Sequence, residues 1–307
     1  MIAAGMSTTS PAPSRSQLSG LQCMALSAFF FSVMSLTVKA AGQRIPTMEL
    51  VFARAVVVSL VAWLDLRRRG VALRGADTRS LLLRGMVGFV ALTCFYYAVV
   101  RLPLAEATVI HFTNPVFTAL IAAVWLGERL RAREFGLAVV GLLGVVVMVR
   151  PAGLFGLAGP PLPLVPVAAS VTAAVLAAVA YVLVRHLRHH DAMLVVFYFA
   201  GFSSLVAFPL MLPAFVWPVG NEWPLLLAVG VTTLLGQIFL TLGLQRERAA
   251  RAVTAGYLQI VFATLWGVLF FAERPGVTTA IGAAIIVATT LALSRVRDRQ
   301  TLPEPSG

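Results

Sequence analysis

The chain contains an approximate copy of itself, displaced by about 145 positions. In the first half, Ala105 and Ala107 precede Asn114, and Glu128 is followed directly by Arg129. The second half repeats this order with Ala250, Ala252, Gln259, Glu273 and Arg274. Because both copies consist mainly of apolar runs, the repeat predicts two similar halves packed against each other.

The composition places both halves in a membrane. Hydrophobic residues make up 59% of the chain and charged residues 12%, with a mean hydropathy of +0.91, whereas a soluble domain has about 25% charged residues. A transmembrane helix needs about 20 mostly apolar residues. Ten apolar runs are candidate spans, and they cover residues 18–41, 48–66, 81–100, 104–126, 135–149, 164–184, 193–212, 223–244, 252–271 and 278–294.

Arginine is concentrated on one side of the predicted membrane. Most of the 24 basic residues lie in short segments on the side of the N-terminus, which the positive-inside rule assigns to the cytoplasm. Both termini are then cytoplasmic, which requires an even number of spans. Because each half has five spans, an odd number, the second copy must enter the membrane in the opposite direction. The sequence therefore predicts an all-α polytopic protein of the cell (inner) membrane, with ten transmembrane helices as two inverted five-helix repeats.

The repeat also divides the chain into domains. We expect a disordered N-terminal tail at 1–17, a first repeat at 18–150, a second repeat at 163–295 and a cytoplasmic C-terminal tail at 296–307. Inverted repeats are typical of transporters, because two halves related by a two-fold axis in the membrane plane can rock around a central site. Alternating access is therefore the expected mechanism.

Several of these residues form the pattern of a known family. The motif residues of the first half are Arg54, Tyr96, Tyr97, Ala98, Ala105, Ala107, Asn114, Pro115, Gly127, Glu128, Arg129, Gly136, Gly141 and Gly144. Those of the second half are Gly243, Ala250, Ala252, Glu273, Arg274 and Gly282. In their order and repetition they resemble the drug/metabolite transporter superfamily, in its ten-helix branch with two EamA-type repeats. The chain departs from that pattern at Ile260, which replaces a proline, and at Ala272, which replaces a glycine, so a kink in the ninth helix stays an open question.

The resemblance implies secondary transport of a small solute. The solute classes that it allows are amino acids and related metabolites, S-adenosylmethionine, nucleotide-derived compounds and amphipathic toxic compounds. The run from Leu81 to Pro151 is similar to the branch that holds S-adenosylmethionine-type carriers and animal orphan solute carriers. The expected partners are a small-molecule solute, the lipid bilayer and a second copy of the chain, bound through the short fifth and tenth helices.

The fourth predicted helix carries the strongest site signal. Thr108, His111, Asn114 and Thr118 recur at intervals of three and four, so they share one helix face. Pro115 cannot donate a hydrogen bond to the carbonyl of His111, which leaves that oxygen free within the membrane. This stripe is expected to bind the solute. The alternative is that these side chains make hydrogen bonds between helices.

Further helices are expected to complete the walls of the site. Their candidate substrate-binding residues are Ser35, Arg54, Tyr97, Tyr181, Gln237, Gln259 and Trp266. The alternative for Tyr181 is that it fills space at the interface between the two halves. Arg54 is expected to pair with Glu49 or with an anionic group of the solute.

Other polar residues of the spans receive structural interpretations. Lys39 is expected to extend its charge to the outer boundary, and Arg84 to reach the cytoplasmic interface. Tyr96 fits an aromatic belt. Glu273 and Arg274, like the equivalent pair of the first half, are expected to be helix-end charges that tie the repeats together.

The energy source stays open between proton antiport, exchange and facilitated diffusion. Lys39 is the only lysine, so the chain lacks the glycine-rich ATP-binding loop that ends in lysine. The twelve acids avoid the middle of the spans, which leaves His111 as the group there that titrates near neutral pH.

Other function classes fit the sequence less well. An intramembrane serine protease needs a histidine after its serine, and no histidine follows Ser203. The net charge of +12 lies in short turns and forms no basic face for nucleic acid. The two cysteines lie inside apolar runs, so we expect no metal site. The chain also lacks a Gly-x-Gly-Asp and a His-Glu-x-x-His motif, so we expect no enzymatic activity and no cofactor. The remaining alternative is a scaffold or pairing subunit without transport, in which the stripe of the fourth helix would be packed and dry.

Overall fold

The computed structural model describes residues 18–73, 77–114, 116–118, 121, 132–149, 162–187, 189–246, 256 and 258–300. Helices of the first half are α1 (Gly20–Ala41), α2 (Thr47–Arg68), α3 (Thr78–Arg101), α4 (Leu104–His111) and α6 (Ala132–Val149). Those of the second half are α7 (Leu164–His186), α8 (Ala192–Met211), the 3-10 turn η1 (Leu212–Ala214), α9 (Glu222–Arg246), α11 (Leu258–Phe271) and α12 (Val277–Gln300). No strand occurs in these ranges. The prediction of an all-α fold is therefore confirmed.

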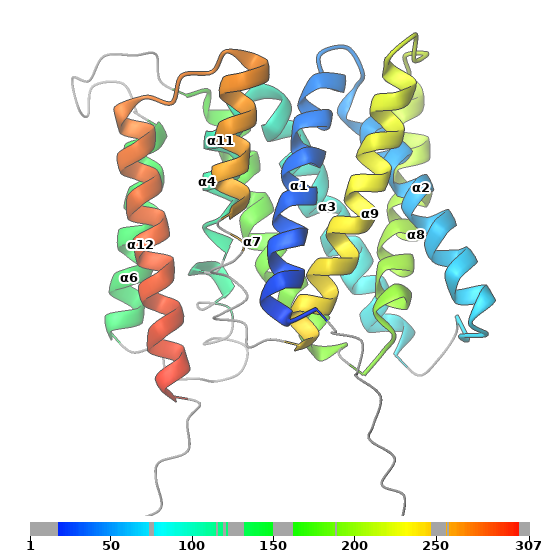
Figure 1. Ribbon diagram of the computed structural model, residues 1–307, viewed down its shortest axis with the longest axis horizontal. Helices are drawn as coiled ribbons and strands as arrows, with labels where there is room; N and C mark the ends of the chain where they lie inside the picture. Colours follow the sequence, from blue (N-terminus) through cyan, green and yellow to red (C-terminus); the bar gives the residue numbers. More distant parts are fainter. Residues whose placement is uncertain are drawn as a thin grey trace, which may run out of the picture.

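The helix packing follows the internal repeat. Three contacts join a helix to its own repeat copy, namely α2 with α8, α4 with α11 and α6 with α12. The remaining large contacts come in equivalent pairs, since α1 packs on α9 as α7 packs on α3. Figure 1 shows the helices side by side, with the start of α1 and the end of α12 at the same lower edge. Two odd-numbered halves that begin and end on one side are inverted relative to each other, as the repeat predicted.

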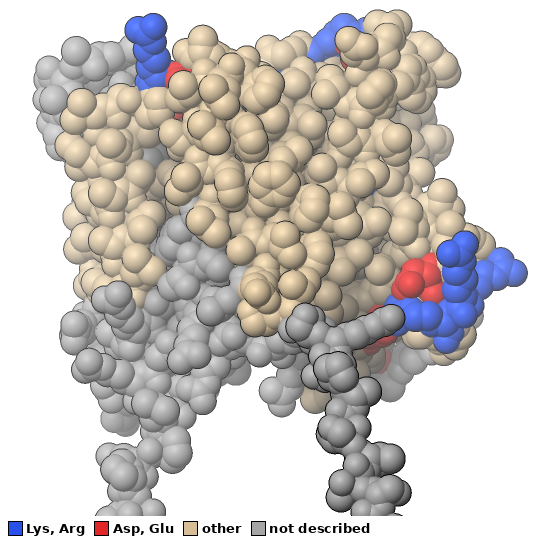
Figure 2. All heavy atoms as spheres, in the orientation of Figure 1, with Lys and Arg blue, Asp and Glu red and all other residues tan. Residues whose placement is uncertain are grey.

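Six of the described helices, α1, α2, α3, α7, α8 and α9, are long and apolar enough to cross a membrane. Two shorter apolar helices lie at Leu258–Phe271 and Val277–Thr289. On the face shown in Figure 2, charged side chains gather at the upper edge and at the lower right, and uncharged residues fill the band between them. This distribution suits a surface that contacts lipid.

The last helix differs from the prediction. It was expected to end at residue 294, but α12 continues to Gln300 through an arginine-rich segment, because arginine is a good helix former. Gly144 of α6 lies against Ile285 and Ile286 of α12, and Gly141 lies against Thr289. These small residues therefore serve packing inside the chain, where a side chain at Gly144 would collide with α12.

Lys39 does not extend to the boundary, so that prediction was wrong. Its side chain is 9% exposed, and its Nζ lies 2.5 Å from Oε1 of Glu273. The same Nζ donates to the carbonyl of Leu102 at 2.6 Å, and Oε2 of Glu273 accepts from the amide of Leu104 at 2.7 Å. The ion pair thus joins the end of α1, the corner between α3 and α4, and the segment after α11. Burial forces this arrangement, because a charge inside protein needs a partner.

The segment after α11 has a backbone conformation that favours glycine. Ala272 has a φ of 50°, in the left-handed region that residues with a side chain seldom adopt. This turn directs Glu273 back towards Gly267, whose carbonyl accepts from the Glu273 amide at 3.1 Å. The departure from the family's glycine at position 272 is therefore a site of backbone strain.

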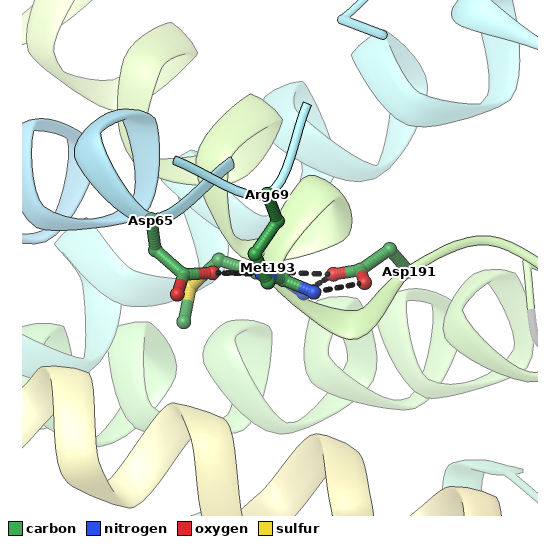
Figure 3. A network of polar contacts seen from close by, with 4 residues as sticks. All are labelled: Asp65, Arg69, Asp191 and Met193. Atoms are coloured by element: carbon green, nitrogen blue, oxygen red, sulfur yellow. Dashed lines mark hydrogen bonds and ion pairs between the residues drawn. The ribbon is translucent and has the colours of Figure 1, made fainter. Parts of the chain in front are cut away.

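A second group of ionic hydrogen bonds joins the two halves at the lower edge. Arg69, which follows α2, donates to Asp65 of α2 and to both carboxylate oxygens of Asp191, the residue that caps α8 (Figure 3). Asp191 also accepts from the amide of Met193 at 2.8 Å. The guanidinium of Arg69 beside Asp191 holds the pKa of that carboxyl below its usual value.

A pair of repeat-related contacts lies at the two edges. At the upper edge, Arg44 is paired with Glu222 at the start of α9. At the lower edge, Nε2 of His190 lies 3.6 Å from Oδ2 of Asp77, just before α3. Asp77 is the repeat copy of Glu222, whereas His190 lies one position beyond the copy of Arg44. Arginine stays charged at every physiological pH, whereas histidine does not.

Removing one partner of the buried ion pair should destabilise the fold. We expect Glu273→Gln to lower the free energy of unfolding by about 3 kcal/mol, because it leaves the charge of Lys39 buried and unpaired. Thermal unfolding of the purified protein in detergent measures the change. Arg274→Gln, at the exposed neighbouring position, is the control. Equal unfolding temperatures for the two variants would contradict the role of the pair.

The contribution of the Arg69 contacts to stability should depend on pH. The carboxyl of Asp191 has a lowered pKa in the folded protein, so its contribution is complete above the unfolded value of about 3.9 and is lost as the pH falls through the folded pKa. We expect Arg69→Ala to lower stability at pH 7 by less than about 1 kcal/mol, since the side chains are partly exposed.

The deficit of the same variant should shrink as the pH falls below about 3.9, measured by thermal unfolding across the pH range. Arg68→Ala, at an exposed position beside Arg69, is the control. A deficit of Arg69→Ala that stays constant from pH 7 to pH 3 would show that Asp191 has no part in it.

Candidate functional site

The fourth helix is interrupted where the sequence places its polar stripe. α4 ends at His111, Phe112 and Thr113 form a turn, and helical structure returns at Asn114. The amide of Thr113 donates to the carbonyl of Ile110 at 3.1 Å, three residues back rather than four. Pro115, the expected cause of the break, lies outside the described residues. Discontinuous helices whose backbone groups are free within the membrane form the solute sites of many transporters.

The four residues of the predicted stripe divide into two kinds. Thr108 and Thr118 turn their hydroxyls back to their own helix, to the carbonyls of Leu104 and Asn114 at 2.7 and 2.8 Å. Asn114 is buried, and its side-chain amide makes no hydrogen bond that the described residues account for. Of this stripe, Nδ1 of His111 is a buried atom without a hydrogen-bond partner among the described residues, and Asn114 places a buried amide beside it in the chain.

His111 lies among aromatic rings. Its ring centroid is 4.6 Å from that of Phe95 on α3 and 6.3 Å from that of Phe112. Its Nδ1 is buried and has no hydrogen-bond partner in the structure. A buried nitrogen without a hydrogen-bond partner is costly, so Nδ1 of His111 is suited to interact with a ligand or a proton.

The copy of this region in α11 faces α4. Gly256, which is the repeat copy of His111, lies so close to the ring of Phe112 that a Cβ there would stand 3.1 Å from it. Gln259, the copy of Asn114, is also buried. The two amides thus occupy equivalent positions on the two helices that cross here.

Trp266 connects α11 to α1. Its Nε1 donates to the hydroxyl of Ser32 at 3.1 Å, and Ser32 donates to the carbonyl of Phe29 at 2.7 Å. Ser35, one turn further along α1, donates to the carbonyl of Phe31 at 3.0 Å. Trp266 and Ser35 therefore form a wall whose polar groups are already bonded within the protein.

Of the two tyrosines at the end of α3, Tyr96 does not lie in the aromatic belt that the sequence suggested, and the role of Tyr97 in the solute site stays a prediction. Tyr96 has no exposed surface, and its hydroxyl has no hydrogen-bond partner in the structure. Tyr97 is half-buried and stacks under the exposed Arg101, whose Cζ lies 3.8 Å from the ring centroid. Tyr96 is thus an interior residue, and Tyr97 has the position that suits a belt, because helix rotation places consecutive residues on different faces.

The expectations for the two arginines inside the spans were wrong in part. Arg54 does not pair with Glu49, because one carboxylate oxygen of Glu49 accepts from the amide of Val216 and the other has no partner in the structure. Arg84 does not reach the interface either, since only 4% of it is exposed. Both guanidiniums instead lie against the ring of Phe199 on α8, with Cζ at 5.0 and 4.4 Å from its centroid.

The remaining candidates lie close to these arginines. Tyr181 on α7 is the hydroxyl-bearing neighbour of Arg84. Gln237 on α9 is buried, and its backbone carbonyl accepts a hydrogen bond from the hydroxyl of Thr241 at 2.8 Å. Thr233, one turn earlier, is buried with its hydroxyl next to that of Tyr96. Sequence reasoning did not include Thr233, Arg84, Tyr96 or Phe199 in the site; the signal for Arg84 was a charge inside an apolar run.

A groove on the outside of the protein is a separate feature. It has a volume of about 560 Å³ and lies between α2 and α8, lined by apolar residues such as Phe52, Trp63, Leu205 and Phe208. It contains none of the predicted site residues. Its open apolar walls suit an acyl chain of the bilayer better than a polar solute.

Comparison with known proteins agrees with this architecture. The model of the EamA-like transporter family matches residues 18–150 and 165–295. The pseudopaline exporter CntI of Pseudomonas aeruginosa is 39% identical over 282 residues, which cover 91% of this chain and 97% of the exporter. Human solute carrier family 35 member G1 is 32% identical over 289 residues, which cover 89% of this chain and 78% of the carrier.

A solved crystal structure of another protein, whose name gives no function, has the same fold as this chain. It aligns with a TM-score of 0.64 at 23% identity and covers 92% of this chain and 99% of its own. Because the family model covers both five-helix halves, the chain belongs to the EamA-like transporter family.

Proposed function

We propose that this membrane transporter is a secondary carrier that moves a small metabolite by alternating access between its two inverted halves. The central site lies between α4 and α11, and α1, α3, α7 and α9 complete its walls. The observation that carries this proposal is the interruption of α4 at Phe112 and Thr113, beside the unpartnered Nδ1 of His111 and the buried amide of Asn114.

The solute is an amino acid, S-adenosylmethionine or a related amphipathic compound. The α4 side of the site offers an imidazole and an amide, whereas the α11 side offers Gln259 beside an indole. Such walls suit a solute with one polar and one apolar end. The relative named as an exporter of pseudopaline favours outward movement of a metabolite, with both termini of the carrier in the cytoplasm.

A second copy of the chain is also proposed as a partner, through α6 and α12. Because Gly141 and Gly144 pack inside the chain, that contact would use the exposed face of Val139, Val140 and Leu143.

Transport in proteoliposomes tests the central proposal. Uptake and counterflow are measured for pooled amino acids and S-adenosylmethionine, with and without a pH gradient. We expect Asn114→Ala to reduce the initial rate at least tenfold, since it removes both polar atoms of a buried amide that would contact the solute. Asn221→Ala, the same change at an exposed position, is the control and should keep the wild-type rate.

His111→Ala separates the possible energy sources. If accumulation requires the pH gradient and His111→Ala removes that requirement, the carrier is coupled to protons. If counterflow ignores the gradient, the protein exchanges or facilitates. Normal rates for both Asn114→Ala and His111→Ala would show that the α4 site is wrong. A wild type that moves no solute would favour the alternative of a scaffold or pairing subunit.

A further inference from the structure

Two arginines are buried inside the membrane-spanning part of the fold. Arg54 of α2 is 2% exposed and Arg84 of α3 is 4% exposed. Arg54 follows the first residue of α2 by seven positions, which places it roughly 10 Å into the helix. Neither side chain forms an ion pair with any residue that the structure describes. Nε of Arg54 and both Nε and Nη1 of Arg84 have no hydrogen-bond partner there, while the hydroxyl of Tyr96 lies beside the Arg54 guanidinium.

The two side chains converge on one place. Their guanidiniums approach the ring of Phe199 from α2 and α3, and the Cζ of Arg54 also lies 6.0 Å from the ring centroid of Tyr96. Tyr181 faces Arg84, and Thr233 faces Tyr96. We call this set the arginine cluster; its members are Arg54, Arg84, Tyr96, Tyr181, Phe199 and Thr233.

The arginine cluster holds hydrogen-bond donors without acceptors. The buried atoms that lack a partner are Nε of Arg54, Nε and Nη1 of Arg84, the hydroxyl of Tyr96 and the hydroxyl of Thr233. A buried donor left unsatisfied costs about 1–3 kcal/mol, and an unpaired buried charge costs several more. The two guanidiniums also repel each other. An anion bound between them would remove all of these penalties together.

The acids of the described residues cannot supply that anion. Glu273 is paired with Lys39, and Glu49 binds the backbone before α9. Glu106, the remaining buried acid in these ranges, accepts from the hydroxyl of Thr279 at 2.7 Å. The acceptor must therefore come from outside these parts of the chain, and in a transporter the solute is the group that enters the interior.

We infer that the arginine cluster binds the carboxylate of the transported solute. This inference rests on the proposed function and adds the solute's charged group to it. A planar guanidinium donates two parallel hydrogen bonds to a carboxylate, and the hydroxyls of Tyr96 and Thr233 provide further donors. The ring of Phe199 offers an apolar surface for the adjoining part of the solute.

The position of the cluster suits a site that opens alternately to both sides. Arg54 and Phe199 occupy equivalent positions of the two repeats, and α2 packs on α8. The guanidinium of Arg54 therefore lies against its own repeat copy, close to the pseudo-two-fold axis. A group held on that axis stays at the centre while the halves rock around it. Because the copy is phenylalanine, the site carries charge from one half only.

Gly88 provides the space that Arg84 occupies. A Cβ at Gly88 would overlap the guanidinium of Arg84 and would also press on the ring of Phe199. Gly88 is therefore a positioning residue for the arginine cluster. Gly88→Ala should displace Arg84 without removing its charge.

Ligand-induced thermal stabilisation of the full-length protein in detergent tests the inference directly. The probes are L-phenylalanine, L-phenylalaninamide, which lacks the carboxylate, and phenyl phosphate. We expect L-phenylalanine to stabilise the wild type and the amide to have no effect. Arg54→Gln and Arg84→Gln should each raise the apparent Kd for L-phenylalanine at least tenfold, and Gly88→Ala should do the same. Arg101→Gln, an exposed arginine on the same helix as Arg84, should bind like the wild type.

The stability of the variants without probe provides a second measurement. Because an unpaired buried charge is unfavourable, we expect Arg84→Met to unfold at the same temperature as the empty wild type or higher. If Arg84 served only to stabilise the fold, Arg84→Met would unfold at a lower temperature than the wild type. A large loss of stability in Arg84→Met, together with no response of the wild type to L-phenylalanine, would overturn the inference. Stabilisation by phenyl phosphate alone would overturn its assignment to a carboxylate.

The inference and the proposed function fail in different ways. If proteoliposomes carry a solute, and its amide derivative moves as fast as the acid in wild type and Arg54→Gln alike, the carboxylate site is wrong while transport stands. If no solute moves but L-phenylalanine binds through both arginines, the proposed function is wrong while the anion site stands.

Discussion

The structure depends on the requirement that every charge and backbone polar group inside a membrane finds a partner within the protein. The ion pair of Lys39 and Glu273 meets this requirement and also supplies partners for the carbonyl of Leu102 and the amide of Leu104. These two backbone groups lie at the corner where α3 ends and α4 begins. One buried pair thus joins the first helix of one half to the last part of the other, and it sets where α4 enters the site.

The same requirement distinguishes the polar groups that the protein satisfies internally from those that can bind a ligand. Where the fold satisfies a side chain internally, as with Thr108, Thr118 and Trp266, little capacity is left for a ligand. Where it does not, as with Arg54, Arg84 and Nδ1 of His111, the free energy of completing the group is available for binding. The helix α3 lies between these two sets, because Phe95 packs on His111 while Tyr96 packs on Arg54.

The inverted repeat supplies symmetric packing, whereas single substitutions make the two halves chemically different. Arg54 opposes Phe199, and Asn114 opposes Gln259. The edge contacts differ as well, since Arg44 is paired with Glu222 whereas a histidine, His190, lies beside Asp77.

The sequence by itself determined the architecture. Hydropathy located ten helices to within a few residues at most ends, and the odd number of spans in each half required inversion, because both are properties of local composition and counting. It also nominated His111 and Asn114, whose spacing on one helix face can be read along the chain, and Gln259 as the repeat copy of Asn114; their role in a solute site stays a prediction.

The tertiary structure alone decided which charges are paired. Lys39 was expected to reach the boundary, yet it meets a residue 234 positions away in the chain, and Arg84 was expected at the interface, yet it lies against Phe199 of the other half. Whether a charge in a span is satisfied depends on the neighbours that packing brings to it. No pattern within a single helix contains that information.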